Sequence, residues 1–163
     1  MGFGIAWWRR DFDCEVSEMA SESATASRPV PIWDKDTLGY WEAARNHVLA
    51  VQKCKDCGAT SFPAWACCRQ CNSMDLEWAP TSGKGAIFTW TTVYRSTRPE
   101  FADDVPFTLA VVELEDYPVL IPARLIGVAP LEAKIDAAVE AQFLDINEDV
   151  SLLQWVLLAE PKA

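Results

Sequence analysis

Five of the six cysteines of this 163-residue chain lie within residues 54–71, CKDCGATSFPAWACCRQC. Four of them form two Cys-x-x-Cys pairs, Cys54 with Cys57 and Cys68 with Cys71, separated by ten residues. A Cys-x-x-Cys turn directs two sulfur atoms toward one point, so two such turns supply the four thiolates of a complete tetrahedral metal site. The spacing therefore predicts that these four cysteines bind one metal ion.

Other uses of the cysteines fit the sequence less well. A disulfide framework needs an oxidising compartment, and a thioredoxin-like redox centre needs only one Cys-x-x-Cys pair. Zinc is the favoured metal, although iron can take the same four thiolates and stays open as an alternative. A site with four protein ligands has no open position for a substrate, which indicates a structural metal.

Other residues with catalytic chemistry are sparse. His47 is the one histidine, and a histidine near a helix end without orienting partners is expected to face solvent. Cys67 can replace Cys68 only through a less usual Cys-x3-Cys turn, so Cys67 and Cys14 are interpreted as bystanders. Three acidic pairs beside turn residues are expected to be solvated loop charges: Asp103–Asp104, Glu115–Asp116 and Glu148–Asp149. An autonomous enzyme would need a catalytic group that this pattern does not supply.

The elements that must position the cysteines begin after a small, polar, proline-terminated stretch, SEMASESATASRPVP. This composition predicts a disordered tail over residues 1–30. Apolar residues in WDKDTLGYWEAARNHVLAVQK recur at steps of three and four, which predicts a short amphipathic helix within residues 31–50. Asp34 or Asp36 is the expected N-cap, and VLAVQK can also be a strand that enters the first cysteine pair.

The pattern changes to β after the cysteine segment, which is expected to cover residues 51–80. The first segment, AIFTWTTVYRS, is rich in β-branched and aromatic residues and is expected to be a strand. A hairpin that turns at EDYP is expected in FTLAVVELEDYPVLIPARLIG. A second hairpin, which turns at INED, is expected in AAVEAQFLDINEDVSLLQWVLLAEP. GVAPLEAKIDA between them is a short helix or a loop. Five strands in about 75 residues favour a small closed barrel over residues 81–163.

The ends and the charge of the chain bear on its location and partners. The first residues, MGFGIAWWRRDFD, have a short apolar run before the arginines, whereas a secretory signal has its charges first and a longer apolar core after them. Acidic residues and prolines interrupt the apolar segment 107–127, so it cannot be a membrane-spanning helix. The chain is therefore expected to be cytoplasmic, without a membrane-spanning helix. Its 24 acidic and 14 basic residues give a net charge of −10, which disfavours general binding of nucleic acid.

Taken in order, these segments resemble a family of acyl-CoA-associated proteins that join a rubredoxin-like zinc ribbon to an OB-fold. The resemblance covers about residues 30–160 and is most specific in the Cys-x-x-Cys-Gly knuckle, the Phe62-Pro63 pair and the run from Trp78 to Gly85. It implies a mainly β fold with an N-terminal helix, a zinc ribbon and a five-stranded OB-fold barrel. It also implies structural zinc bound by the four cysteines of the two pairs.

Members of this family accompany thiolases, aldolases or MaoC-type enoyl-CoA hydratases. The resemblance therefore implies a non-catalytic accessory subunit of a thiolase-like, hydratase-like or aldolase complex that acts on acyl-CoA. The expected partner is a thiolase-like or hydratase-like protein, with acyl-CoA as a further candidate and neither nucleic acid nor membrane. The alternative is a zinc-ribbon OB-fold protein that binds nucleic acid through Phe88, Trp90 and Tyr94. The net charge argues against this alternative.

Two cations are candidates for contact with CoA. The Gly83–Gly85 segment, GKG, lacks the spacing of a phosphate-binding loop and is most simply a turn into the first barrel strand. The sharper hypothesis is that Lys84, together with Arg95, Arg98 or Arg124, binds the phosphates of CoA. Lys84 and Arg124 are the two residues predicted to bind CoA.

Trp65 is the candidate for a partner interface. The family commonly has Arg at this position, and Pro where this chain has Arg69. Neither residue is a metal ligand, so both departures leave the metal prediction intact. Because a loop between metal ligands projects from a rigid base, Trp65 is expected to contact a protein partner.

Overall fold

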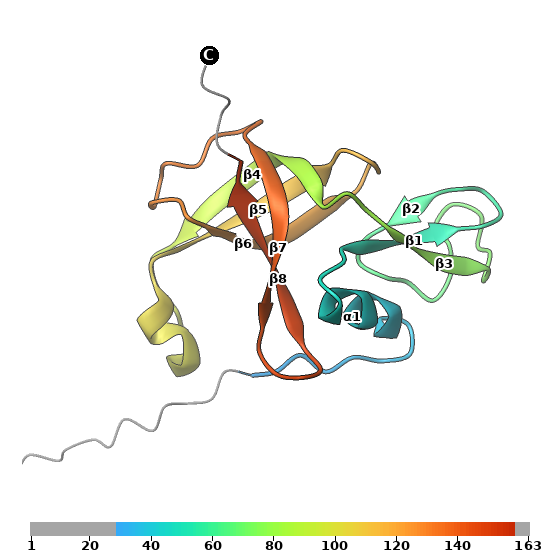
Figure 1. Ribbon diagram of the computed structural model, residues 1–163, viewed down its shortest axis with the longest axis horizontal. Helices are drawn as coiled ribbons and strands as arrows, with labels where there is room; N and C mark the ends of the chain where they lie inside the picture. Colours follow the sequence, from blue (N-terminus) through green and yellow to red (C-terminus); the bar gives the residue numbers. More distant parts are fainter. Residues whose placement is uncertain (1–28, 159–163) are drawn as a thin grey trace, which may run out of the picture.

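A computed structural model describes residues 29–158 as one short helix, a small three-stranded sheet and a closed barrel. The helix α1 (Leu38–Arg45) lies below the small sheet and beside the lower part of the barrel in Figure 1. This arrangement confirms the predicted mainly β fold with a helix, a cysteine ribbon and a five-stranded barrel. Within residues 29–158 no helix has the length and apolar character needed to cross a membrane.

The small sheet, called the ribbon below, has β1 at its centre. Its strands are β1 (Ala50–Cys54), β2 (Thr60–Ser61) and β3 (Leu76–Pro80), all antiparallel to their neighbours. The VLAVQK segment, which the sequence left open, is therefore largely strand. α1 ends at Arg45, and His47 adopts a positive φ of 57°, which turns the chain into β1.

The barrel contains five strands in the order β4-β5-β6-β8-β7. Their bounds are β4 (Lys84–Val93), β5 (Phe107–Leu114), β6 (Leu120–Ile126), β7 (Ala138–Asp145) and β8 (Ser151–Leu157). The two predicted hairpins, β5–β6 and β7–β8, are both antiparallel pairs. A short parallel pairing of β6 with β8 and an antiparallel pairing of β4 with β7 close the barrel.

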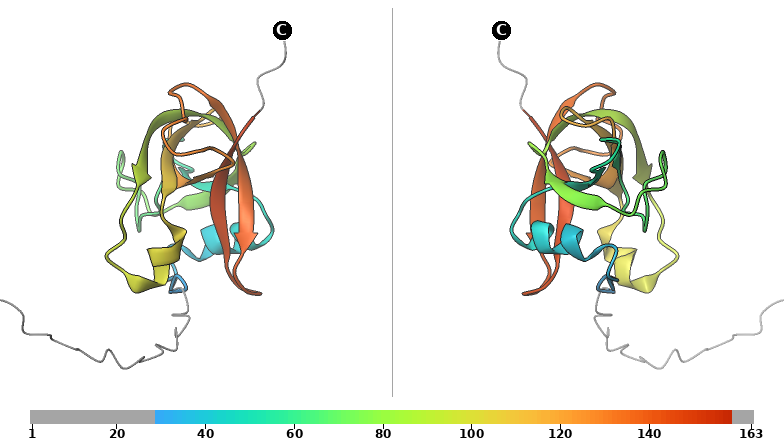
Figure 2. Two further views of the ribbon diagram at one scale, coloured as in Figure 1. Left: turned by 90° about the vertical axis from the view of Figure 1, so that its left-hand side faces the viewer. Right: turned by 90° about the vertical axis from the view of Figure 1, so that its right-hand side faces the viewer.

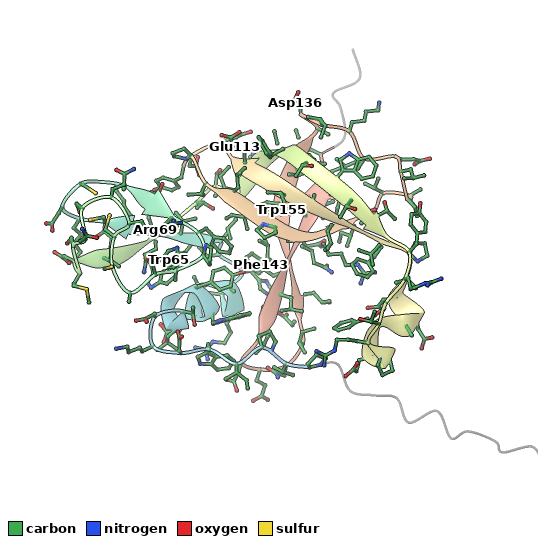
Figure 3. The ribbon with its side chains drawn as sticks, turned by 180° about the vertical axis from the view of Figure 1, so that it is seen from behind. Trp65, Arg69, Glu113, Asp136, Phe143 and Trp155 are labelled. Carbon is green, nitrogen blue, oxygen red and sulfur yellow. The ribbon has the colours of Figure 1, made fainter. Side chains whose placement is uncertain are left out.

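The barrel core follows the two-residue alternation of the strands. Along β5, every second residue from Thr108 to Leu114 is buried, and Trp155 of β8 is fully buried in the same cluster. The Trp155 indole N–H donates to the carbonyl of Ile121 at 3.2 Å, so this large side chain is buried with its polar atom satisfied. Figure 3 labels Trp155 within the barrel.

One element was not predicted. The connection between β4 and β5 contains a 3-10 helix, η1 (Pro99–Asp104), whereas the segment GVAPLEAKIDA has turns and no helix. Figure 2 shows α1 and η1 at the same end of the barrel, where the described N-terminal segment also lies. The chain leaves the barrel at the other end.

The start of α1 differs from the prediction. Thr37 is the N-cap residue, so the expectation of Asp34 or Asp36 at that position was wrong. The Asp34 carboxylate instead accepts the N–H groups of Asp36 and Thr37, each at 3.0 Å, and forms the turn that precedes the helix. Asp34 thus orders the turn that leads into the helix.

α1 packs against the ribbon through small and aromatic residues. Gly39 lies so close to the Trp78 indole of β3 that a Cβ atom there would overlap the ring. Tyr40 packs edge-on against Phe62 with 5.6 Å between ring centroids, and burial raises the pKa of its hydroxyl to about 12. The helix and the ribbon therefore form one packed unit.

His47 joins this unit to the barrel. Its Nε2 lies 2.8 Å from Asp145 Oδ1, and its ring stacks on Phe143 of β7 at 5.7 Å. The Ser151 hydroxyl donates to the same carboxylate oxygen at 2.6 Å, and this hydrogen bond, followed by that of His47, lowers the pKa of Asp145. The expectation that His47 has no orienting partner was wrong, although its side chain is exposed as predicted.

We predict that Gly39→Ala destabilises the protein. Alanine normally stabilises a helix relative to glycine, but here the added methyl group must displace the Trp78 indole, at a cost of about 1–3 kcal/mol. Urea unfolding would measure the loss. Glu42→Ala, on the exposed side of the same helix, is the matched control and should change stability little. A Gly39→Ala variant as stable as the wild type would contradict the close packing.

We predict that Asp145→Asn destabilises the protein at neutral pH, by an amount that becomes smaller as the pH falls below 3.8. Because the pKa of the folded carboxyl is lowered, its stabilising effect exists above the ordinary value of 3.8 and disappears as pH falls through the folded value. Urea midpoints of both proteins at pH 7 and at about pH 3 would test this. Glu148→Gln, in the same hairpin, is the control. An equal deficit at both pH values would argue against a role for the charge.

Candidate metal centre

The two cysteine turns have the same backbone geometry. In each turn, the N–H four residues after the first cysteine donates to the carbonyl of that cysteine, at 2.9 Å for both Cys54 and Cys68. The residue at that fourth position has a positive φ, 72° at Gly58 and 61° at Asn72. Glycine and asparagine are the residues that adopt this conformation most readily, so the sequence specifies both turns locally.

The sulfur atoms of the four cysteines converge as predicted. All four Sγ atoms lie within 4.8 Å of one another, and the pairs Cys54–Cys71 and Cys57–Cys68 are each 3.6 Å apart. A tetrahedral site with metal–sulfur bonds of about 2.3 Å requires sulfur atoms about 3.8 Å apart, whereas a disulfide requires about 2.05 Å. Backbone N–H groups of Cys71 and Gln70 lower the pKa of the Cys68 thiol to about 6, whereas contact with the Cys57 thiol and burial raise the pKa of Cys71 to about 12. The donor set therefore fits a metal ion.

The cluster offers four protein ligands and no open position. Cys54 and Cys68, the first cysteine of each turn, are buried, whereas Cys57 and Cys71 are exposed. Cys67 is a free, half-buried thiol outside this group, so it does not replace Cys68. Such a site can hold the ribbon together but cannot bind a substrate to its metal.

The loop between the two turns is fixed by a buried side chain of β1. Gln52 accepts the N–H of Trp65 at 3.0 Å and donates to the Trp65 carbonyl at 2.9 Å. Ser61 also donates to the Gln52 amide oxygen, at 3.3 Å. These hydrogen bonds of Gln52 are called the Gln52 clamp below. The sequence indicates it only by one amide side chain in the otherwise apolar run LAVQK, and the role of Gln52 was not predicted.

Trp65 itself lies on the surface of the ribbon. Its side chain is 44% exposed, and the Arg69 guanidinium lies over its ring at 4.8 Å from the centroid. Figure 3 labels both residues on the ribbon. Trp65 and Arg69 are therefore in contact with each other.

Lys84 and Arg124 are not brought together. The Lys84 carbonyl accepts the N–H of Glu115, just after β5, whereas Arg124 of β6 lies opposite Leu109 of β5. Positions 109 and 115 are six residues apart, which is about 20 Å along a strand at about 3.3 Å per residue. One phosphate group therefore cannot contact both side chains.

Arg124 and Arg98 are occupied by neighbouring groups. Arg124 lies 3.5 Å from an Asp104 carboxylate oxygen and over the Phe107 ring, at 5.1 Å from its centroid. Arg98 donates to Glu100 at 3.2 Å. Both cations are partly neutralised within the β4–β5 region, so they do not form a basic patch with Lys84.

The three acidic pairs are less simple than expected. Asp104 is paired with Arg124, and Asp149 lies 3.9 Å from Arg45. The Asp116 carboxylate accepts the backbone N–H of Ser82, which lowers the pKa of that carboxyl. One member of each pair therefore ties its loop to another element. Asp116 and Asp149 are exposed as predicted, whereas Asp104 is only 16% exposed, so the prediction of a solvated charge was wrong for Asp104.

A cavity of about 190 Å³ lies between η1 and the β7–β8 hairpin. Its walls are largely apolar and include the Arg124–Asp104 pair. The residues that line it are Pro29, Pro31, Phe101, Asp104, Phe107, Arg124, Leu144, Ile146, Leu152, Leu153 and Gln154. The lining comes from five separate segments of the chain, which is why sequence patterns did not indicate it.

We predict that Cys57→Ser lowers the metal content well below one ion per chain and unfolds the ribbon. Metal binding to structural four-ligand sites contributes about 10–16 kcal/mol, so the loss of one thiolate removes most of what folds this segment. Elemental analysis and circular dichroism would measure both effects. Cys67→Ser is the matched control and should retain the metal. Full occupancy in Cys57→Ser, or loss in Cys67→Ser, would refute the ligand assignment.

Comparison with known proteins agrees with this architecture. A family model described as the ChsH2 rubredoxin-like zinc ribbon domain matches residues 41–77, and one described as the ChsH2 C-terminal OB-fold domain matches residues 78–144. A solved structure titled "Ltp2-ChsH2(DUF35) aldolase" is similar with a TM-score of 0.71 and 25% identity, over 78% of this chain and 98% of that chain.

The chain is also similar to two curated proteins whose names describe a role. The chain is 27% identical over 146 residues to the probable enoyl-CoA hydratase alpha subunit of Thermomonospora curvata, covering 90% of this chain and 45% of that protein. It therefore spans less than half the length of that relative. It is 37% identical over 110 residues to the DUF35 domain-containing scaffold protein of Pyrococcus furiosus, covering 67% of this chain and 79% of that protein. The chain thus belongs to the DUF35 family of ChsH2-type proteins, which join a rubredoxin-like zinc ribbon to an OB-fold.

Proposed function

We propose that this protein is a non-catalytic accessory subunit that binds a hydratase-like, thiolase-like or aldolase-like protein or domain acting on acyl-CoA. The observation that carries the proposal is the closed four-cysteine site, because it gives the ribbon a rigid framework without catalytic chemistry. Catalytic groups would then belong to the partner, and the chain described here would bind and position it.

The other polar clusters of the described residues support this view. His47, Asp145 and Ser151 contain the side-chain types of a catalytic triad, but His47 and Ser151 both contact the same oxygen of Asp145. The serine hydroxyl donates to the carboxylate instead of to the histidine, so no base is placed to activate it. The cluster is better explained as the joint between the helix–ribbon unit and the barrel.

The names of the relatives support the class of partner. One relative is called an enoyl-CoA hydratase alpha subunit, another a scaffold protein, and the similar structure an aldolase. This chain corresponds to 45% of the hydratase alpha subunit, so more than half of that relative has no counterpart here. We propose a partner that resembles that remaining part or the aldolase, in the cytoplasm, where thiols stay reduced.

Zinc is the proposed metal. Four thiolates in tetrahedral arrangement suit zinc, and the matching ribbon model is itself described as a zinc ribbon. A colourless purified protein with stoichiometric zinc would support this assignment, and a coloured protein with stoichiometric iron would contradict it.

Contact with CoA is proposed for Lys84 in preference to Arg124. Arg124 is paired with Asp104, so an incoming phosphate must compete with an existing carboxylate. Lys84 is exposed and has no ion pair among the residues that the structure describes. The alternative function, binding of nucleic acid, would need a run of unpaired cations, whereas the net charge is −10 and Arg98 and Arg124 are both paired.

We predict that tagged protein co-purifies with a hydratase-like, thiolase-like or aldolase-like protein from the same cells and changes its turnover of an acyl-CoA substrate. The Cys57→Ser variant should lose this partner, because its ribbon cannot form without the metal. Mass spectrometry of the co-purified protein and a coupled activity assay would measure both. If no acyl-CoA enzyme binds and no activity changes, the accessory role is wrong.

A further inference from the structure

We propose that the stacked pair of Trp65 and Arg69 is the contact by which the ribbon binds its protein partner, and that it fits an apolar pocket bordered by a carboxylate. This inference rests on the accessory role proposed above and specifies the surface and the chemistry that it recognises.

The pair is exposed and oriented before any partner binds. The Arg69 guanidinium covers one face of the Trp65 indole, at 4.8 Å from the ring centroid, and the indole remains 44% exposed. Stacking holds both long side chains in one arrangement, so less conformational entropy is lost on binding. Tryptophan and arginine are also the residues most enriched among those that dominate protein interfaces.

The backbone beneath the pair is fixed from three directions. Gln52, which is buried, holds the Trp65 N–H and carbonyl with two hydrogen bonds. Trp65 lies between Cys57 and Cys68, and Arg69 directly follows Cys68, so the metal ligands restrain both positions.

The charge balance of the ribbon indicates what Arg69 can recognise. The ribbon, residues 50–80, contains three cations, Lys53, Lys55 and Arg69, and three carboxylates. Lys55 is paired with Asp75 at 2.8 Å, whereas the contact described for Arg69 is with an aromatic ring. A guanidinium that stacks by its face still presents its N–H groups at its edge, where they can bind a carboxylate bidentately.

A protein carboxylate fits this site better than the nucleotide end of CoA. The adenine and phosphates of CoA would also suit a tryptophan and an arginine, but several phosphate charges need several cations. Besides Arg69 the ribbon offers only Lys53 and the paired Lys55, and it carries Asp56, Asp75 and Glu77 as well. One stacked arginine therefore favours a single carboxylate beside an apolar pocket.

Affinity measurements with the co-purified partner test the proposal. We expect Trp65→Ala and Arg69→Ala each to raise the Kd about tenfold or more, which is the range of residues that dominate interfaces. Arg69→Lys should recover only part of the loss, because lysine cannot stack or bind a carboxylate bidentately. Met74→Ala is the matched control, since Met74 is 73% exposed on the same ribbon, and its Kd should stay within about twofold. Metal content must remain one ion per chain in every variant.

The outcomes separate this inference from the accessory role. If the wild type binds the partner and both alanine variants bind within about twofold of it, the pair is not the contact, while the accessory role stands. If the wild type binds no acyl-CoA enzyme, both proposals fail. If coenzyme A alone binds the wild type and Trp65→Ala abolishes that binding, the pair recognises a nucleotide and the protein-docking proposal is overturned.

Discussion

The convergence of four cysteine sulfur atoms within 4.8 Å is the constraint on which the rest of the ribbon depends. Four ionised thiolates at this distance would repel one another, so a cation between them would stabilise the arrangement. The three strands of the ribbon have only five, two and five residues, too little structure to bury a core of their own. Two contacts connect the cysteine cluster to its surroundings: Gln52 orders the loop between the two turns, and Trp78 of β3 packs against α1.

How far the sequence predicts this molecule depends on how local each feature is. The cysteine turns and the two hairpins are specified by neighbouring residues, such as Gly58 after the first pair and the alternating pattern of β5. Contacts that form only when the barrel closes cannot be predicted from neighbouring residues. His47 meets Asp145 across 98 positions, and Lys84 is separated from Arg124 by a register that no local pattern encodes. The contact of Trp65 with Arg69 is short in sequence, but side-chain stacking depends on a loop path that the Gln52 clamp defines.

The barrel uses its cations differently from an OB-fold that binds single strands. Such folds combine a basic groove with exposed aromatic residues. Here Phe88 and Tyr94 are exposed, yet Arg124 is paired with Asp104 and lies over Phe107. The result is a neutralised, largely apolar cavity between η1 and the β7–β8 hairpin. The same barrel architecture therefore presents a surface suited to apolar groups.

The matched turns of the cysteine cluster also bear on how quickly the metal can exchange. In both turns the first cysteine is buried and the second, Cys57 or Cys71, is exposed. A chelator or a metal-donating protein must therefore approach the two outer sulfur atoms, while the inner two keep hold of the ion. During exchange, the incoming ligand would replace Cys57 and Cys71 first. The buried cysteines, Cys54 and Cys68, would release the metal last.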